Sequence, residues 1–245
     1  MPERPGVCLV VGAGDGLGGA LARAFAAEGM TVCVTRRAKS LEALNAMVAT
    51  IESTGGRAVA HGVDARSEDE MIALFETVER DVGPIGVVIF NIGANVYFPI
   101  RETTARVFHK VWEMACFAGF LTGREAAKVM VPRGRGTILF TGASASLRGR
   151  EGFSAFASAK AGLRAVAQSM ARELGPQGIH VAHVVIDGPV DGVFMRSLRD
   201  DVDQMLEADA ILKPADIAAS FVALHRQPRS AWSHELDLRP WTETW

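Results

Sequence analysis

The segment Val7-Cys8-Leu9-Val10-Val11-Gly12-Ala13-Gly14-Asp15-Gly16-Leu17-Gly18 decides the fold of this chain. Its apolar, β-branched first half predicts a buried strand, and the glycine-rich turn that follows opens a helix expected over residues 19–28. Glycines at a strand–helix junction let the backbone approach a pyrophosphate, whose charge the helix N-terminus favours. The segment therefore predicts a nucleotide-binding turn, with the cofactor contacts Gly12, Asp15, Gly16, Leu17 and Gly18.

The rest of the chain alternates between strand-like and helical patterns. Apolar runs predict further strands at residues 31–35, 58–61, 85–90, 137–141 and 179–186, and a last strand within 232–241. One of the helices between them opens with Ser67 and Glu70, a pair that predicts a reciprocal capping box. Such alternation predicts parallel strands joined by right-handed crossovers, with helices on both faces of the sheet. We expect one doubly wound α/β domain over residues 1–245.

Composition excludes several classes of function. The 26 Lys and Arg residues nearly balance the 28 Asp and Glu residues, so nothing favours nucleic acid or an anionic membrane as a partner. The three cysteines cannot form a closed disulfide set, and their spacing matches no metal site. No signal-peptide core precedes the first strand, and no apolar run approaches the ~20 residues that span a bilayer. These features predict a soluble, cytoplasmic protein without a metal.

The second predicted strand ends in Arg36-Arg37. An NAD site usually has a carboxylate at this place, which accepts a hydrogen bond from the ribose 2′-hydroxyl group. Two guanidinium groups instead suit a 2′-phosphate, because arginine pairs with phosphate bidentately and keeps its charge. We therefore expect NADP(H) to be preferred over NAD(H), although a solvated basic loop would have the same sequence.

Together these motifs resemble the short-chain dehydrogenase/reductase (SDR) family over nearly the whole chain. Gly12-x-x-x-Gly16-x-Gly18 is similar to the glycine motif of that family, and Asp64 to the aspartate that holds the adenine amino group. The resemblance implies a Rossmann-type parallel sheet of about seven strands. It also implies cofactor contacts from three later segments: Asp64 and Ala65; Asn91, Ile92 and Gly93; and Gly188 and Val190.

The resemblance fails at most of the catalytic positions. Of the usual Asn, Ser, Tyr and Lys, only the lysine is present, as Lys160, and it is expected to bind the nicotinamide ribose. Phe156 occupies the tyrosine position four residues earlier, on the same helix face. Ala143 stands at the serine position, directly before Ser144, and the asparagine position falls near Ala115-Cys116.

Loss of a positioned general acid typically costs ~10²–10⁴ in rate. The sequence therefore predicts slow or altered chemistry. Three substitutes are available: Ser144 or Ser146 as the group that polarises a carbonyl, a proton relay through Lys160, and Tyr97, the only tyrosine. Each also has an ordinary structural interpretation, as a loop serine, a ribose anchor or a packing aromatic.

Aromatic residues predict the character of the substrate. Tyr97, Phe153 and Phe194 are expected to line a pocket, covered by a lid over about residues 189–212. This pattern is consistent with a small hydrophobic or aromatic carbonyl, alcohol or conjugated substrate. Two functions remain open: an NADP(H)-dependent oxidoreductase with a non-standard proton route, and a catalytically impaired NADP(H)-binding protein that acts as a sensor or scaffold.

The resemblance also implies self-association. Members of the family usually form homodimers or homotetramers through two helices, which this chain is expected to have at about residues 104–131 and 153–174. Apolar residues occur on more than one face of these helices, as burial against both the sheet and a partner requires.

Overall fold

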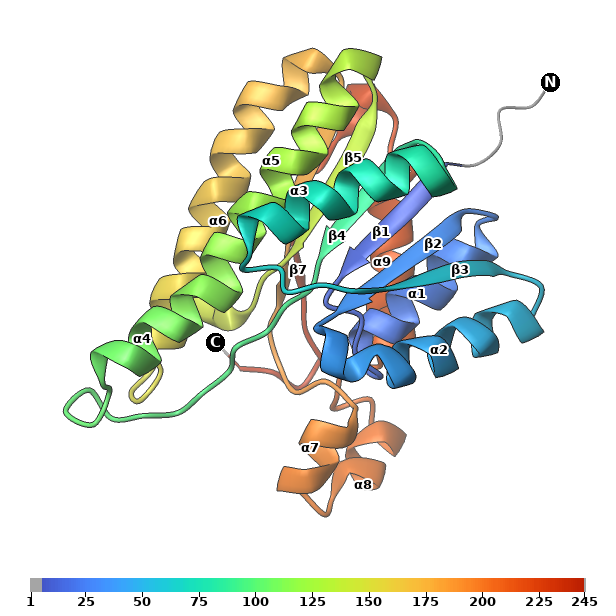
Figure 1. The fold of residues 1–245 in the computed structure, drawn as a ribbon. Coiled ribbons are helices and arrows are strands. Elements are labelled where there is room, and N and C mark those ends of the chain that lie inside the picture. Colours follow the sequence, from blue (N-terminus) through green and yellow to red (C-terminus); the bar gives the residue numbers. More distant parts are fainter. Residues whose placement is uncertain (1–5, 245) are drawn as a thin grey trace.

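Seven parallel strands form the centre of the computed structural model, which describes residues 6–244 (Figure 1). Their order across the sheet is β3-β2-β1-β4-β5-β6-β7, so the direction of winding reverses between β1 and β4. The strands are β1 Val7–Val11, β2 Thr31–Arg36, β3 Arg57–Gly62, β4 Ile85–Phe90, β5 Gly136–Thr141, β6 Ile179–Ile186 and β7 Glu235–Leu238. The doubly wound fold predicted from the sequence is confirmed, and its switch point lies beside the glycine-rich turn.

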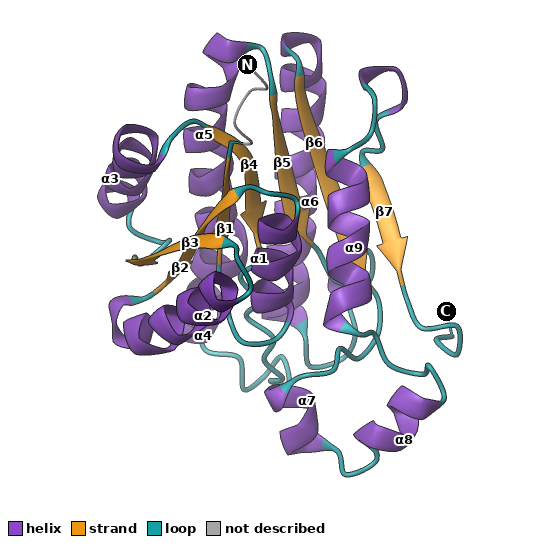
Figure 2. Cartoon of the chain, turned by 90° about the vertical axis from the view of Figure 1, so that its right-hand side faces the viewer, coloured by secondary structure: helices purple, strands orange, loops and turns teal. Residues whose placement is uncertain are grey.

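Helices cover both faces of the sheet (Figure 2). They are α1 Leu17–Ala27, α2 Leu41–Ser53, α3 Glu68–Thr77, α4 Ala105–Trp112, α5 Ala118–Met130, α6 Ser154–Leu174, α7 Val193–Leu198, α8 Val202–Glu207 and α9 Pro214–His225. Successive side chains of a strand enter opposite cores, since the strand period is two. Cys8 and Val10 pack with α1, α2 and α9, whereas Leu9 and Val11 pack with α3, α5 and α6. All five residues of β1 are buried, as in a sheet covered on both sides.

The helix expected over residues 104–131 is interrupted. A π-helical turn, Glu113–Phe117, separates α4 from α5 and contains the buried residues Ala115 and Cys116. Turns of this kind occur mostly as local bulges and often mark functional sites. The turn itself contains no proline or glycine that would have signalled the interruption.

The start of α3 corrects one local prediction. Ser67 caps the helix as expected, and its Oγ accepts a hydrogen bond from the amide of Glu70 at 3.3 Å. The carboxylate of Glu70 does not complete a capping box with Ser67. It accepts instead from the amide of Asp64, with a distance of 2.8 Å between Asp64 N and Glu70 Oε2. The Glu70 side chain therefore stabilises the loop after β3 instead of the N-terminus of α3.

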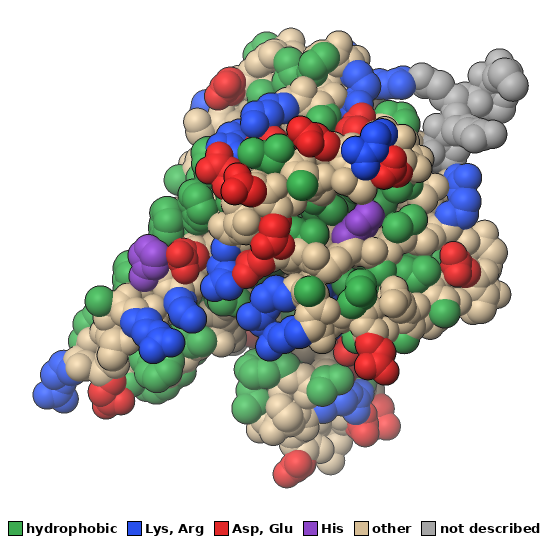
Figure 3. Space-filling view, in the orientation of Figure 1, with side chains coloured by type: hydrophobic (Ala, Val, Ile, Leu, Met, Phe, Trp, Pro, Cys, Tyr) green, Lys and Arg blue, Asp and Glu red, His purple; other side chains and the backbone are tan. Residues whose placement is uncertain are grey.

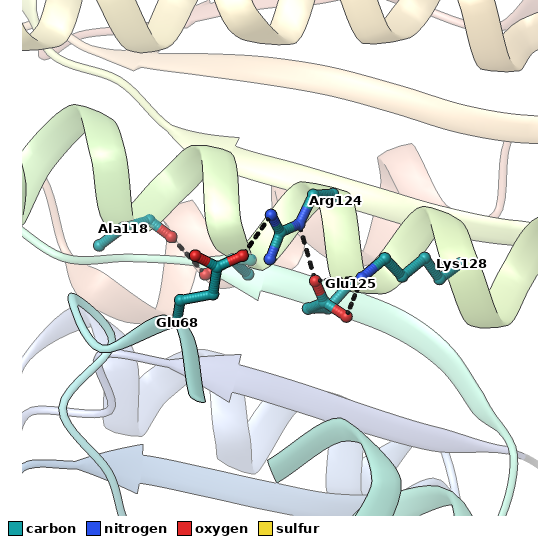
Figure 4. Close-up of polar contacts among 6 residues, drawn as sticks. Glu68, Ala118, Arg124, Glu125 and Lys128 are labelled. Carbon is teal, nitrogen blue, oxygen red and sulfur yellow. Dashed lines mark hydrogen bonds and ion pairs between the residues drawn. The ribbon is translucent and has the colours of Figure 1, made fainter. Parts of the chain in front are cut away.

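Ion pairs connect α3 to α5 on the outer surface (Figure 4). Arg124 of α5 contacts Glu68 at 2.7 Å and the neighbouring Glu125 at 2.8 Å, and Lys128 contacts Glu125 at 2.9 Å. The side chain of Glu125 is buried, so its two cationic partners offset the cost of removing its charge from water.

The short helices α7 and α8 form a lobe beyond the carboxyl edge of the sheet (Figures 1 and 2). The chain enters and leaves this lobe at one place, because Leu212 N donates to Pro189 O and Asp191 N donates to Leu212 O, each at 2.9 Å. These bonds coincide with the limits expected for the lid. Within residues 6–244, no helix combines the length and apolar character that a bilayer span requires.

Candidate nucleotide groove and active site

Two cavities lie side by side along the carboxyl edge of the sheet. The first, of about 280 Å³, lies beyond β2 and β3, and the second, of about 270 Å³, lies beyond β4, β5 and β6. Both are lined by Asn91, Ile92 and Gly93, which follow β4 at the switch point. A doubly wound sheet binds its ligands at this place. Because they share these three residues, the two cavities form one continuous groove, with one part for each end of a dinucleotide.

The glycine-rich turn forms the wall between β1 and α1. Gly12 has a φ of +96°, and a Cβ built there would lie 2.9 Å from Ile92 Cγ1, so a side chain is excluded for two reasons. Asn91 Nδ2 donates to Gly12 O at 3.1 Å and ties this turn to the end of β4. By contrast, a Cβ on Gly14 or Gly16 would meet nothing within 4 Å, which leaves the outer side of the turn open.

The first turn of α1 suits an anion. Gly16 at its N-cap offers no side-chain acceptor, and the first turn contains no acidic residue. The amide of Gly19 donates to Gly14 O at 2.7 Å and that of Ala20 to Gly16 O at 3.1 Å, so the amides that precede them, together with the positive end of the helix dipole, are the donors that this end of α1 can offer. A diphosphate fits the donors that the chain provides here.

Three arginines line the first cavity: Arg36, Arg37 and Arg66. Within the described part of the chain, neither Arg36 nor Arg37 has a hydrogen-bonded acidic partner. Arg66 differs, because its Nε lies 2.9 Å from Asp64 Oδ1 and its second guanidinium nitrogen contacts Oδ2 at 2.5 Å. These hydrogen bonds, with a smaller effect from the charge of Arg37, lower the pKa of Asp64. Figure 3 shows Lys and Arg side chains gathered on this face, above the α7–α8 lobe.

Lys160 lies at the base of the second cavity. It is 3% exposed, and its Nζ donates to Thr141 O at 2.8 Å and to Ile92 O at 3.2 Å. Burial lowers its pKa to about 8, because desolvation disfavours the charged form. The ring of Phe156, one helical turn earlier on α6, also lines this cavity, with its centroid 6.0 Å from Nζ.

Cys116 approaches Lys160 from the π-helical turn. A Cβ built on Gly162 of α6 would lie 2.9 Å from Cys116 Sγ, so this glycine allows the turn to pack closely on α6. Burial raises the pKa of the thiol, and the charge of Lys160 opposes that rise only in part. Cys116 is consequently a neutral thiol at neutral pH, where a polar side chain was expected from the resemblance.

The serines after β5 have different environments. Ser146 is buried, and its Oγ accepts from the amide of Ala143 at 3.1 Å, which fixes the shape of the loop. Ser144 lines the second cavity and also a third one, of about 180 Å³, next to it. Of the two serines, Ser144 is therefore the one that lines the groove.

The third cavity extends the groove away from the nucleotide end. Its lining residues are Asn95, Ser144, Ala145, Arg148, Arg150, Phe153 and Phe156. Phe153, which was expected to line a substrate pocket, lines this cavity. Tyr97 packs edge-on against Phe153, with centroids 5.4 Å apart, and lies over Gly152 outside the three cavities. Phe194 is 61% exposed on α7 and also lies outside them.

Most of the residues expected to bind the cofactor come together. Those in the first cavity are Gly12, Arg36, Arg37, Asp64, Ala65, Asn91, Ile92 and Gly93, and the second cavity adds Leu17, Lys160, Gly188 and Val190. Asp15, Gly16 and Gly18 line neither cavity. Sequence reasoning missed Ser40, Arg66 and Asn95, although Arg66 follows Asp64 at the short spacing typical of a loop ion pair. No group of three or more potential metal ligands occurs among the described residues.

Comparisons with known proteins agree with this geometry. Residues 6–203 match the family model described as short chain dehydrogenase. A short-chain dehydrogenase/reductase of Armillaria gallica is 31% identical over 75% of this chain and 70% of its own. The crystal structure of a short-chain dehydrogenase from Rhodopseudomonas palustris is 51% identical, with a TM-score of 0.83 over 96% of this chain and 99% of that one. A metagenomic short-chain oxidoreductase in complex with NADP is 26% identical, with a TM-score of 0.81 over 96% of each chain.

Proposed function

The chain belongs to the short-chain dehydrogenase family, and from this premise we propose that it is an NADP(H)-dependent oxidoreductase with a non-standard proton route. The substrate is a small carbonyl compound or the corresponding alcohol. The observation that carries the proposal is the groove itself. It presents an open glycine turn and two arginines that have no acidic partner within residues 6–244 at one end, and a buried lysine at the other.

The preference for NADP(H) rests on Arg36 and Arg37. Both line the first cavity, where a carboxylate would otherwise meet the ribose 2′-hydroxyl group. Their guanidinium groups suit a phosphate in charge and shape. A similar structure in complex with NADP supports the same choice.

The chemistry of the second cavity follows from the side chains that line it. When bound, NADPH supplies the hydride, which forms a C–H bond as the carbonyl π bond breaks. Lys160 holds the ribose end, and its pKa of about 8 lets it exchange a proton near neutral pH. The hydroxyl group of Ser144 polarises the carbonyl oxygen, which takes its proton from water. Phe156 occupies the place of the usual acid and contributes a ring without a hydroxyl group.

The first experiment is a parallel titration with NADPH and NADH, followed through tryptophan emission. We expect saturable NADPH binding and much weaker NADH binding. Turnover of a panel of ketones and enones is then measured for the natural protein and for Lys160→Ala, which should abolish it. Unchanged activity in Lys160→Ala would remove this lysine from the mechanism, and failure of both cofactors to bind would end the enzyme proposal.

The same experiment separates the alternative function. Tight NADPH binding without turnover of any carbonyl would identify a sensor or scaffold that retains the cofactor as a ligand. The replacement of polar groups around Lys160 by Phe156, Ala143 and Cys116 is the observation that favours this outcome.

We also propose a homodimer or homotetramer formed through α4 and α5. Phe108, Trp112 and Phe120 are each close to 40% exposed, and Phe117 stacks between the rings of Trp112 and Phe120. A row of exposed aromatic residues marks an interaction site more often than a free surface. A monomeric mass in light scattering at micromolar concentration would contradict the proposal.

A further inference from the structure

The third cavity differs from the rest of the groove in its charge. Arg148 and Arg150 line it together with Phe153 and Phe156, and no acidic side chain is among the described residues that line it. Ser144 lines it where it joins the second cavity. A molecule in this space would therefore contact both aromatic carbon and guanidinium groups.

Arg148 is held in place by a buried acid. One of its guanidinium nitrogens lies 3.0 Å from Asp187 Oδ1 and 3.1 Å from Oδ2, and Asp187 is 2% exposed. A buried carboxylate needs such a partner, so this pair is structural. It fixes one wall of the cavity and leaves little net charge there.

Arg150 is in a different state. Its side chain is 61% exposed, and its contact with an acid is a loose one, 4.0 Å from Glu243 Oε1. Glu243 lies on the last turn of the chain, and its Oε2 comes within 3.6 Å of a Cβ built on Gly188, beside the second cavity. A carboxylate of the protein itself therefore lies near Arg150 without forming a hydrogen bond to it.

We propose that the third cavity binds the carboxylate of a small oxo acid or hydroxy acid. This inference rests on the proposed function and names its substrate class. The carboxylate pairs with Arg150, displacing the loose contact with Glu243, and the apolar or aromatic body lies against Phe153 and Phe156. The carbonyl carbon then faces Ser144 and the nicotinamide end of the groove. At about 180 Å³ the cavity holds about six water volumes of roughly 30 Å³ each, which limits the acid to a small one.

The test compares two probes of nearly equal shape, benzoate and benzamide, by calorimetric titration of the NADPH-saturated protein. We expect benzoate to bind about 10-fold more tightly, because only benzoate forms a charge-assisted pair with arginine. The difference should shrink as salt is raised from 0.05 M to 0.5 M. Equal affinity for the two probes would overturn the inference.

Two variants that should change benzoate affinity in opposite directions test whether Arg150 binds the carboxylate. Arg150→Gln should weaken benzoate binding about 5–10-fold, whereas Glu243→Gln should strengthen it about 2–3-fold by removing the competing carboxylate. Arg172→Gln, which changes an exposed arginine near the distant end of α6, is the matched control and should change nothing. Benzoate affinity that is the same in Arg150→Gln and in the natural protein would contradict the placement of the anion.

Failure of this inference can be distinguished from failure of the proposed function. NADPH affinity is measured separately in each variant and should not change, because Arg150 does not line the nucleotide end of the groove. If NADPH does not bind, the benzoate and benzamide titrations are run on the protein alone and still decide the charge preference. If turnover is found, phenylglyoxylate should have a KM about 5–10-fold lower than its methyl ester.

Discussion

The nucleotide end and the reaction end of the groove are built in different ways. At the nucleotide end, the groove is formed by backbone around Gly12 and by two neighbouring arginines, half-buried Arg36 at the last position of β2 and exposed Arg37 directly after it. At the reaction end, Lys160 is buried and held by the carbonyl oxygens of Ile92 and Thr141, 68 and 19 residues away in the chain. One end depends on short segments of sequence and the other on packing between distant ones.

This difference explains how the reaction end can lose polar side chains while the nucleotide end and the position of Lys160 are kept. The hydrogen bonds of Lys160 go to backbone oxygens, so they are independent of which side chains occupy positions 143 and 156. A buried ammonium group is costly without partners, and the two carbonyls offset that cost. The groove can therefore remain intact while its chemistry changes.

The largest expected effect comes from restoring a hydroxyl group at the reaction end. Phe156→Tyr should raise the rate of reduction of simple ketones by ~10²–10⁴, the usual contribution of a positioned general acid. Steady-state kinetics with saturating NADPH measure it. Phe153→Tyr is the matched control, because Phe153 lines the third cavity but not the second, and it should give no comparable gain. No gain in Phe156→Tyr, with NADPH affinity unchanged, would mean that the reaction end has been remodelled beyond one hydroxyl group.

At the nucleotide end, two glycines should respond very differently to alanine. A Cβ on Gly18 would lie 2.6 Å from both Ala13 Cα and Gly12 O, so Gly18→Ala forces α1 away from β1. We expect it to lower the free energy of unfolding by about 2–4 kcal/mol, measured by urea denaturation.

Gly14→Ala is the control for this clash. Its Cβ would meet nothing within 4 Å, so the free energy of unfolding should stay within about 0.5 kcal/mol of the natural value. Its effect should appear in NADPH affinity instead, because Gly14 lines the first cavity. If Gly14→Ala and Gly18→Ala lowered the free energy of unfolding equally, any side chain would strain this turn, even at a position with open space around the Cβ.

The same contrast, between features set by a short segment and features set by packing between distant segments, separates what the sequence could predict from what it could not. Strands such as Val7–Val11 and Ile179–Ile186 were predicted to the residue, because an apolar run between turns is a local signal. The π-helical turn was not, because the packing of Cys116 against Gly162 across two helices leaves no mark in either segment. The Glu70 carboxylate likewise accepts from the amide of Asp64, and not from that of Ser67, only once the loop after β3 is folded.

His183 allows a test of the packing behind the reaction end. It is fully buried, its Nδ1 lies 3.1 Å from Glu235 Oε2, and a Cβ on Gly142 would lie 2.3 Å from its Nε2. Desolvation lowers its pKa to about 4; Glu235 opposes this, and the charges of Lys160 and Arg164 assist it.

Because its pKa is lower in the folded state than the usual 6.5, His183 should destabilise the protein in acid. Its contribution to stability is complete above pH 6.5 and is lost as the pH falls through 4, by up to about 3 kcal/mol. Urea denaturation across this pH range should show a shallower decline for His183→Leu. His109→Gln, which changes an exposed histidine on α4, should keep the natural slope. Parallel slopes in all three proteins would mean that other groups dominate acid unfolding.

The smallest effect should come from the arginines at the nucleotide end. Arg36→Gln and Arg37→Gln should each weaken NADPH binding about 10-fold and change NADH binding less than about 2-fold, since a charged hydrogen bond to a 2′-phosphate contributes about 1.4 kcal/mol or slightly more. Arg57→Gln, at the amino end of β3, is the control for a general change in charge. Parallel titrations measure all three. If NADPH and NADH weakened equally, the arginines would be acting on a group that both cofactors share, and the open turn at Gly14 and Gly16, not the end of β2, would determine cofactor affinity.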